Sequence, residues 1–394
     1  MSNCVKKNKS VLLVGANLRA MFFVARKLWQ SKWYVDVVDF EPIPIQNSKY
    51  IRKYYKLAQD NSLNNLVDKI IDIIKNIDYE VVIPINDVGI LICNEFNAKF
   101  QDYSRIILPK SESVEYSRNK YKLFELSLKC GFSNPETIYV QNKAKLVDVL
   151  DTISNGSIVA KSCSSKRVCD GIIKSYSVFK TDDKREIIDR FCDEAEFPIM
   201  IQKYVQGTEI GYNFYAEAGI VKASYFDRFF RGNFGEECMS RQSIGFDSEL
   251  AKKLNALIEK IGWDGVGMFD LILHDDDVFI LELNGRFWAS VDLSEKINSG
   301  IWELYSNKYL KTNLIVPIRS NAIVTLVNAI SVNKKIIRNI VGFKGFGENL
   351  HLIYDIIRSM FSRNYYIQEC LLSDSKFYRK LFLHYLKKIF IHDK

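Results

Sequence analysis

The sequence contains few of the residues that carry nucleophilic or zinc chemistry. Its 394 residues include four histidines and eight cysteines. The cysteines are scattered, and they form neither a CxxC pair nor a zinc spacing with histidine. We therefore expect reduced thiols, and neither a zinc site nor a serine–histidine–aspartate triad.

Three further features are missing from the sequence. No apolar run approaches the ~20 residues of a membrane-spanning helix, and residues 1–10 lack the apolar segment of a secretory signal. The turn after the first apolar run, at 15–20, has no GxGxxG pattern. We expect a cytoplasmic protein that binds no dinucleotide cofactor.

The overall composition is that of an ordinary folded enzyme. Hydrophobic residues make up 47% and charged residues 26% of the chain, and the length favours two or three domains. The 55 lysines and arginines exceed the 47 aspartates and glutamates, which gives a net charge of +8. Because basic and acidic residues are mixed along most of the chain, we expect no nucleic-acid partner. Formation of a homo-oligomer stays open.

Segment 376–394 is an exception to this mixing. It carries six basic residues against one acidic residue, with large apolar and aromatic residues between them. Such a helix is typical of peripheral contact with the anionic inner face of a membrane. The alternative, which we favour, is a capping helix whose apolar side packs on the core.

Residues 11–109 alternate between strand and helix patterns. The predicted strands are 11–14, 34–38, 81–85 and 106–109, and the predicted helices are 18–29 and 63–74. This alternation predicts a parallel, doubly wound α/β sheet.

Residues 116–310 show an α+β pattern instead. The predicted strands are 137–140, 157–161, 198–205, 210–216, 220–226 and two near 265–270 and 278–284; the predicted helices are 117–130, 144–153, 184–193 and 248–261. Polar residues predict a loop at 162–170 and another after 226 that holds Arg228, Arg231 and Arg241. From about 311 the pattern becomes helical.

The segment 278–287, Val-Phe-Ile-Leu-Glu-Leu-Asn-Gly-Arg-Phe, carries the clearest chemical signal. Side chains alternate along a strand, so Glu282 and Asn284 share one face. Two oxygen donors on an apolar strand are poor core residues and good ligands for a hard cation. Asp270 ends an earlier strand and can complete the site, and Arg286 can neutralise phosphate. The pattern predicts a magnesium–nucleotide site, against the alternative of a solvated strand end.

Taken in order, these elements resemble the ATP-grasp superfamily of carboxylate–amine ligases, in the arrangement of carbamoyl-phosphate synthase and biotin carboxylase. The resemblance covers about residues 1–310. It implies a Rossmann-like preceding domain at 1–115, ATP-grasp subdomains at 116–195 and 196–310, and a C-terminal helical region at 311–394.

The resemblance also implies how ATP is held. Lys120 in Ser-Arg-Asn-Lys and Lys161 in Ile-Val-Ala-Lys look like the family's phosphate-binding lysines. Glu209 resembles the acid that binds the ribose hydroxyls. The segment that looks like the adenine-binding hinge contributes Gln202, Lys203 and Val205. The alternatives are a surface lysine for Lys161 and a structural salt bridge for Glu209.

The loop 162–171 resembles the family's phosphate-covering loop, with one departure. It contains a single glycine, Gly171, where such loops use several to bring backbone N–H groups close to phosphate. Serine, lysine and arginine side chains in the loop could replace those contacts.

Asp270, Glu282 and Asn284 resemble the family's metal ligands, which implies Mg²⁺, or Mn²⁺ in its place. The implied substrates besides ATP are a small carboxylate and an amine, namely an amino acid, a peptide or an amino sugar. The carboxylate becomes an acylphosphate, which the amine attacks. Arg286 and Lys161 would stabilise the transferred phosphoryl group, and Arg241 is the favoured arginine for binding the substrate carboxylate.

Two other functions remain open from the sequence. The glycine-poor loop is compatible with a protein that binds ATP as a sensor or scaffold and does not turn it over. The basic segment 376–394 is compatible with a membrane-associated adaptor.

Overall fold

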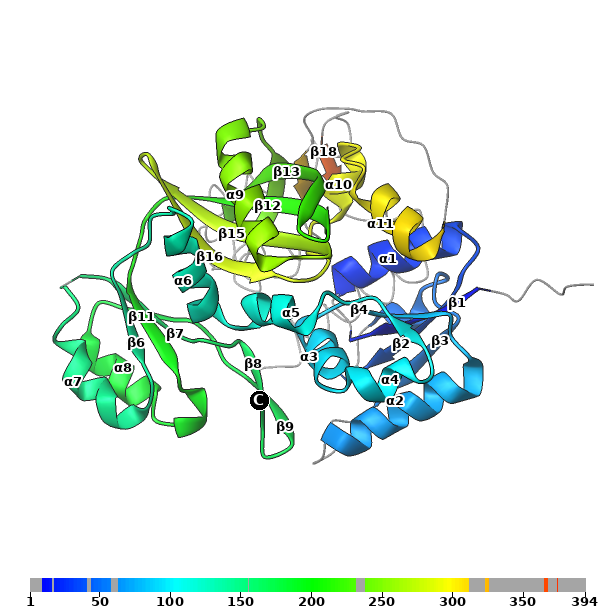
Figure 1. The fold of residues 1–394 in the computed structure, drawn as a ribbon, viewed down its shortest axis with the longest axis horizontal. Helices are drawn as coiled ribbons and strands as arrows, with labels where there is room; N and C mark the ends of the chain where they lie inside the picture. The colour runs from blue at the N-terminus through cyan, green and yellow to red at the C-terminus, as the bar shows by residue number, and fades with distance from the viewer. Residues whose placement is uncertain are drawn as a thin grey trace, which may run out of the picture.

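The computed structural model describes residues 9–15, 18–40, 44–57, 63–154, 156–231 and 238–311, together with 323–325, 365–367 and 374. These residues form a five-stranded, a four-stranded and a seven-stranded sheet, and a separate two-stranded hairpin. In Figure 1 the five-stranded sheet lies beside the seven-stranded sheet, and the four-stranded sheet stands apart at the opposite end.

The first sheet is parallel, with the order β3-β2-β1-β4-β5. Its strands are β1 (Ser10–Val14), β2 (Tyr34–Asp39), β3 (Lys53–Lys56), β4 (Val81–Pro84) and β5 (Arg105–Ile106). All five residues of β1 are buried, as a parallel strand covered by helices on both faces requires. The predicted parallel, doubly wound sheet is confirmed, and β3 is a strand that the sequence prediction missed.

Alternation along β1 divides the core between the two faces of this sheet. Val11 and Leu13 contact α1 (Leu18–Gln30), while Leu12 and Val14 face α2 (Leu63–Ile77) and α3 (Asp87–Glu95). The remaining helices of this part are η1 (Pro44–Asn47), α4 (Asn97–Gln101) and α5 (Ser111–Arg118).

The four-stranded sheet is antiparallel, in the order β10-β7-β11-β6. Its strands are β6 (Thr137–Val140), β7 (Ile158–Ser162), β10 (Phe179–Thr181) and β11 (Ile199–Lys203), and its helices are η2 (Lys143–Lys145), α7 (Leu146–Leu150), α8 (Lys184–Arg190) and η3 (Glu194–Glu196). Its buried core is drawn from this unit alone.

The seven-stranded sheet has the order β16-β15-β12-β13-β14-β17-β18. Its strands are β12 (Thr208–Glu217), β13 (Ile220–Arg231), β14 (Cys238–Ser243), β15 (Gly265–His274), β16 (Asp277–Asn284), β17 (Ile323–Thr325) and β18 (Tyr365–Ile367). One face packs on α6 (Lys120–Lys129) and α9 (Ser248–Ile261). The helices α10 (Asp292–Lys296) and α11 (Ile301–Leu310) follow β16.

Two predicted loops are strands in the structure. Residues 162–170 contribute β8 (Lys166–Cys169), which pairs with β9 (Ile172–Ser175) as a hairpin. Asp170 and Gly171 form its turn with positive φ angles of 54° and 75°, as an Asp-Gly hairpin turn requires. The loop predicted after 226 is also wrong at its arginines, because Arg228 and Arg231 lie on β13 and Arg241 lies on β14.

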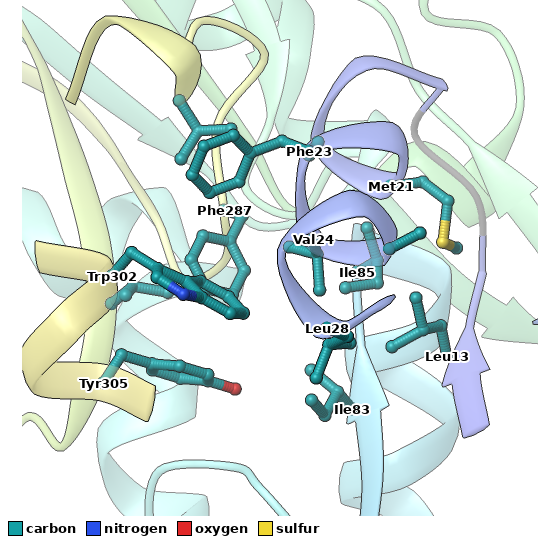
Figure 2. Close-up of a cluster of buried hydrophobic side chains, with 14 of the residues drawn as sticks. Leu13, Met21, Phe23, Val24, Leu28, Ile83, Ile85, Phe287, Trp302 and Tyr305 are labelled. Carbon is teal, nitrogen blue, oxygen red and sulfur yellow. The ribbon is translucent and has the colours of Figure 1, made fainter. Parts of the chain in front are cut away.

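A shared apolar core joins the first sheet to the end of the seven-stranded part. Figure 2 shows Phe23 of α1 facing Phe287, Trp302 and Tyr305, which follow β16 in the sequence. The rings of Phe23 and Trp302 meet edge-to-face, with centroids 5.8 Å apart. These two parts therefore share one densely packed core, which positions the end of β16.

The predicted helical region 311–394 lies largely outside the described residues, and this includes the basic segment 376–394. Where the structure does describe it, the residues form β17 and β18, so the helical prediction is wrong there. No helix among the described residues has both the length and the apolar character needed to cross a bilayer.

Candidate functional site

A cavity of about 880 Å³ lies between the four-stranded sheet and the strands β12, β15 and β16. Its walls are largely apolar, as nucleotide-sized pockets usually are. Eight of the predicted site residues line it, namely Lys120, Lys161, Gln202, Lys203, Val205, Glu209, Asp270 and Glu282. The structure thus brings together residues that are up to 162 positions apart in the sequence.

The two predicted phosphate lysines meet at one end of this cavity. Lys161 lies on β7 and is only 8% exposed. Burial, followed by repulsion from Lys120, lowers the pKa of Lys161 to about 8. Lys120 is the first residue of α6. The side chain of the N-cap residue Asn119 accepts hydrogen bonds from the backbone N–H groups of Tyr121 and Lys122. A capped helix start holds Lys120 in a fixed place.

Asp270 and Glu282 sit opposite each other on the neighbouring strands β15 and β16. Glu282 forms an ion pair with Lys120, with 3.1 Å between Nζ and Oε2. The charge of Lys120 lowers the pKa of Glu282. Burial, and then the charge of Glu282, raise the pKa of Asp270. Two carboxylates held this close favour a positive charge between them.

Asn284 connects the two carboxylates. Its Nδ2 donates to Asp270 Oδ2 at 2.9 Å and to Glu282 Oε1 at 3.5 Å. Asp270 Oδ1 is buried, with no hydrogen-bond partner among the described residues. A buried carboxylate oxygen in this position suits a hard cation with oxygen ligands. No cluster of three or more His, Cys, Asp or Glu suited to a metal occurs in the described part of the chain. A third ligand from Asn284 would be its Oδ1, which in this structure accepts a hydrogen bond from Arg286 Nη2.

Arg286 makes a contact that the sequence did not predict. Its Nε and Nη2 donate to the two carboxylate oxygens of Asp87, at 2.8 and 3.2 Å. Its Nη2 also donates to Asn284 Oδ1 at 3.1 Å. Asp87 opens α3 after the N-cap Asn86, which follows strand β4. Asp87 follows the carboxyl end of β4, beside β1, where the strand order of the sheet reverses. Parallel sheets commonly bind ligands at this point, so the predicted sheet could have indicated Asp87.

The predicted hinge residues lie at the end of β11. The Gln202 amide donates to Thr137 Oγ1 at 2.9 Å, and Lys203 Nζ donates to Ser154 Oγ at 3.2 Å. Val205 lies just beyond the strand and, like Glu209 at the start of β12, lines the cavity. All four residues therefore line the same cavity, which Arg286 does not line.

Arg241 is held differently from the other predicted residues. It is 4% exposed, its Nε donates to Asp227 Oδ2 at 3.0 Å, and its guanidinium lies over the Phe229 ring. It lines neither the large cavity nor the pocket beside Arg286. A Cβ on Gly211 would come within 2.4 Å of Asp227 Oδ1, so the glycine makes room for this pair. The structure places Arg241 in a buried ion pair beside the site, which weakens the prediction that it binds substrate.

Comparison with known proteins supports the fold and leaves the activity open. No family model matches the sequence. An uncharacterized protein of Methanocaldococcus jannaschii is 25% identical over 319 residues, which are 77% of this chain and 75% of that protein.

Two solved structures superimpose on most of the chain. One is an L-amino acid ligase from Bacillus licheniformis, with a TM-score of 0.60 at 15% identity, over 78% of this chain and 75% of that one. The other is the biotin carboxylase domain of 2-oxoglutarate carboxylase from Hydrogenobacter thermophilus, solved with MgADP and bicarbonate. It has a TM-score of 0.61 at 12% identity, over 79% of this chain and 73% of that one.

Proposed function

We propose that this chain, which has the ATP-grasp fold, is an ADP-forming ligase that joins a carboxylate to an amine. The observation that carries the proposal is the convergence of Lys120, Lys161, Asp270 and Glu282 on a nucleotide-sized cavity, with Asn284 hydrogen-bonded to both carboxylates. Cations and oxygen ligands from separate strands have no packing reason to gather there, and phosphoryl transfer needs both.

The residues that line the cavity support one orientation for ATP. The base would lie near Gln202, Lys203 and Val205, with the ribose at Glu209. The triphosphate would then reach Lys161 and the carboxylates. Asp270, Glu282 and Asn284 would hold Mg²⁺, or Mn²⁺ in its place, which when bound neutralises charge on the β- and γ-phosphates.

The reaction is a pair of displacements. An oxygen of the substrate carboxylate attacks the γ-phosphorus, and the bond to the bridging oxygen breaks, so that ADP leaves with the electron pair. Lys161 and Arg286 stabilise the charge on the transferred group. The amine then attacks the acyl carbon, phosphate leaves, and the nitrogen loses a proton. The chain provides position and charge, and it forms no covalent bond with substrate.

Release of ADP tests this proposal. The purified chain would be given MgATP, pools of small carboxylic acids, and hydroxylamine, which traps acylphosphates as hydroxamates. We expect ADP and hydroxamate to form in equal amounts and only with acid present. If ATP binds but no pool raises ADP release, the chain is the nucleotide-binding scaffold that its glycine-poor hairpin would suit.

The pH dependence of nucleotide binding follows from Lys161. Its pKa of about 8 means that the ammonium is charged below that pH and neutral above it. Affinity for MgATP should therefore fall as the pH rises through about 8, by up to about tenfold, because one charged hydrogen bond to phosphate is lost. Titration calorimetry would measure this, and Lys161→Arg should flatten the profile because arginine stays charged. A wild-type affinity that does not change across this range would contradict the assignment.

The division of the chain into domains is also a proposal. We assign 1–115 to the preceding domain, 116–195 and 196–310 to the two ATP-grasp subdomains, and 311–394 to a C-terminal region. Membrane contact through 376–394 would be tested by sedimenting the chain with anionic liposomes, with and without that segment.

A further inference from the structure

A second, smaller pocket adjoins the nucleotide cavity. It shares Lys120 and Glu282 with that cavity and extends from them toward Asn284, Arg286 and the start of α3. Its volume is about 90 Å³, against about 880 Å³ for the larger cavity. We call it the acid pocket, and its charged walls are Asp87, Arg118, Lys120, Lys166, Glu282 and Arg286.

The charges of the acid pocket do not cancel. It has four cationic side chains and two carboxylates. Asp87 is bound to Arg286, and Glu282 to Lys120. Arg118 pairs outside the pocket with Glu95, at 2.7 Å. Lys166 instead donates to the hydroxyl of Ser175, a neutral partner. A guest here therefore meets an excess of positive charge, which favours an anion.

Lys166 is fixed in the pocket wall by the hairpin that carries it. The Leu63 N–H donates to the carbonyl of Gly171 at 2.8 Å, and Ile173 packs on the core of the first sheet. At the base, Arg167 donates to the carbonyl of Pro198 at 3.0 Å. Figure 1 shows the hairpin β8–β9 reaching from the four-stranded unit toward α2 and α3. Docking at both ends holds the backbone that carries Lys166 in place, which lowers the entropic cost of binding.

The acid pocket lies where the carboxylate substrate would have to approach the γ-phosphate of ATP. Any group inside it lies next to Glu282 and Lys120, where the γ-phosphate of ATP would be. The attacking carboxylate must approach from that place, since the nucleotide fills the other side. The small volume admits a short acid and leaves little room for a peptide or a sugar.

Building on the proposed ligase activity, we propose that the acid pocket binds the carboxylate substrate, and that this substrate is a short acid with a second anionic group. Its reacting carboxylate lies between Lys120 and Arg286, and its second anionic group binds Lys166. Lys166 lines the acid pocket and not the larger cavity, so we assign it to the acid and not to the phosphates of ATP, which the resemblance of loop 162–171 had suggested.

Two acids of equal chain length test the charge requirement. Succinate has two carboxylates and butyrate has one. With MgATP and hydroxylamine, succinate should give more hydroxamate per unit time than butyrate, by about tenfold or more for one added charged hydrogen bond.

Substitutions in the β8–β9 hairpin test the role of Lys166 in binding the acid. Lys166→Met should raise the KM for succinate about tenfold or more, leave the KM for ATP unchanged, and abolish the preference over butyrate. Lys166→Arg should restore the preference. Lys174→Met is the matched control, because Lys174 lies on the same hairpin and pairs with Asp193 at 3.3 Å; it should behave as wild type.

The outcomes separate this inference from the ligase proposal. If butyrate is used as well as succinate, or if Lys174→Met acts like Lys166→Met, the acid pocket is overturned and the ligase stands. If no short diacid or phosphorylated acid raises ADP release but another acid pool does, the acid pocket is also overturned and the ligase stands. If no acid pool raises ADP release in a chain that binds MgATP, both fall.

Discussion

Replacing Glu282 by glutamine is expected to reduce Mg²⁺-dependent ADP release by about 100-fold or more, because the carboxylate that would hold the charge-neutralising Mg²⁺ is lost. The substitution keeps the shape of the side chain and takes away its charge. The Glu282 side chain is 35% exposed, so the change leaves no cavity and should not unfold the protein. Acid-dependent ADP release and the thermal melting temperature measure the two effects separately.

Asp275→Asn is the control for this substitution. Asp275 lies in the turn between β15 and β16, its side chain is 90% exposed, and asparagine tolerates its positive φ of 52°. We expect wild-type ADP release from it. Retained release in Glu282→Gln, with Asp275→Asn unchanged, would refute the assignment of Glu282 as a metal ligand.

Replacing Arg241 by methionine is expected to destabilise the protein by about 3–5 kcal/mol, the usual cost of leaving one partner of a buried ion pair without the other. The side chains of Arg241 and Asp227 are 5% and 0% exposed. Burial raises the pKa of Asp227 against the opposing effect of Arg241, so loss of the arginine would leave a carboxylate that is costly to keep charged. Chemical denaturation measures the free energy of unfolding.

Two further variants decide whether Arg241 has a structural or a substrate-binding role. The double variant Asp227→Asn, Arg241→Met should recover part of the lost stability, because the buried charge is gone. Arg228→Met, an exposed neighbour on β13, should change stability little. If Arg241→Met kept its stability and lost only acid-dependent ADP release, Arg241 would bind the substrate carboxylate as the sequence predicted.

Much of the candidate site was visible in the sequence because strand alternation is a local property. Glu282 and Asn284 share a face of β16 wherever the strand lies, and Lys161 ends an apolar run that forms β7. The β8–β9 hairpin was missed although Asp170 and Gly171 are a recognised hairpin turn. The residues around this turn were taken for a loop, since the two strands are only four residues long and partly buried, and polar residues outnumber apolar ones from 162 to 170.

The sequence by itself determined most of the strands and helices before residue 311, though neither β3 nor the β8–β9 hairpin. It also determined which polar residues share a face, because these features depend on the backbone period and on near neighbours. Only the tertiary structure decided that Arg286 meets Asp87, 199 positions away, and that Arg241 is enclosed with Asp227. Such contacts depend on how separate sheets pack against one another, and the same local pattern is compatible with many packings. The sequence shows which side chain stands at each position, whereas the residue that this side chain contacts depends on the whole fold.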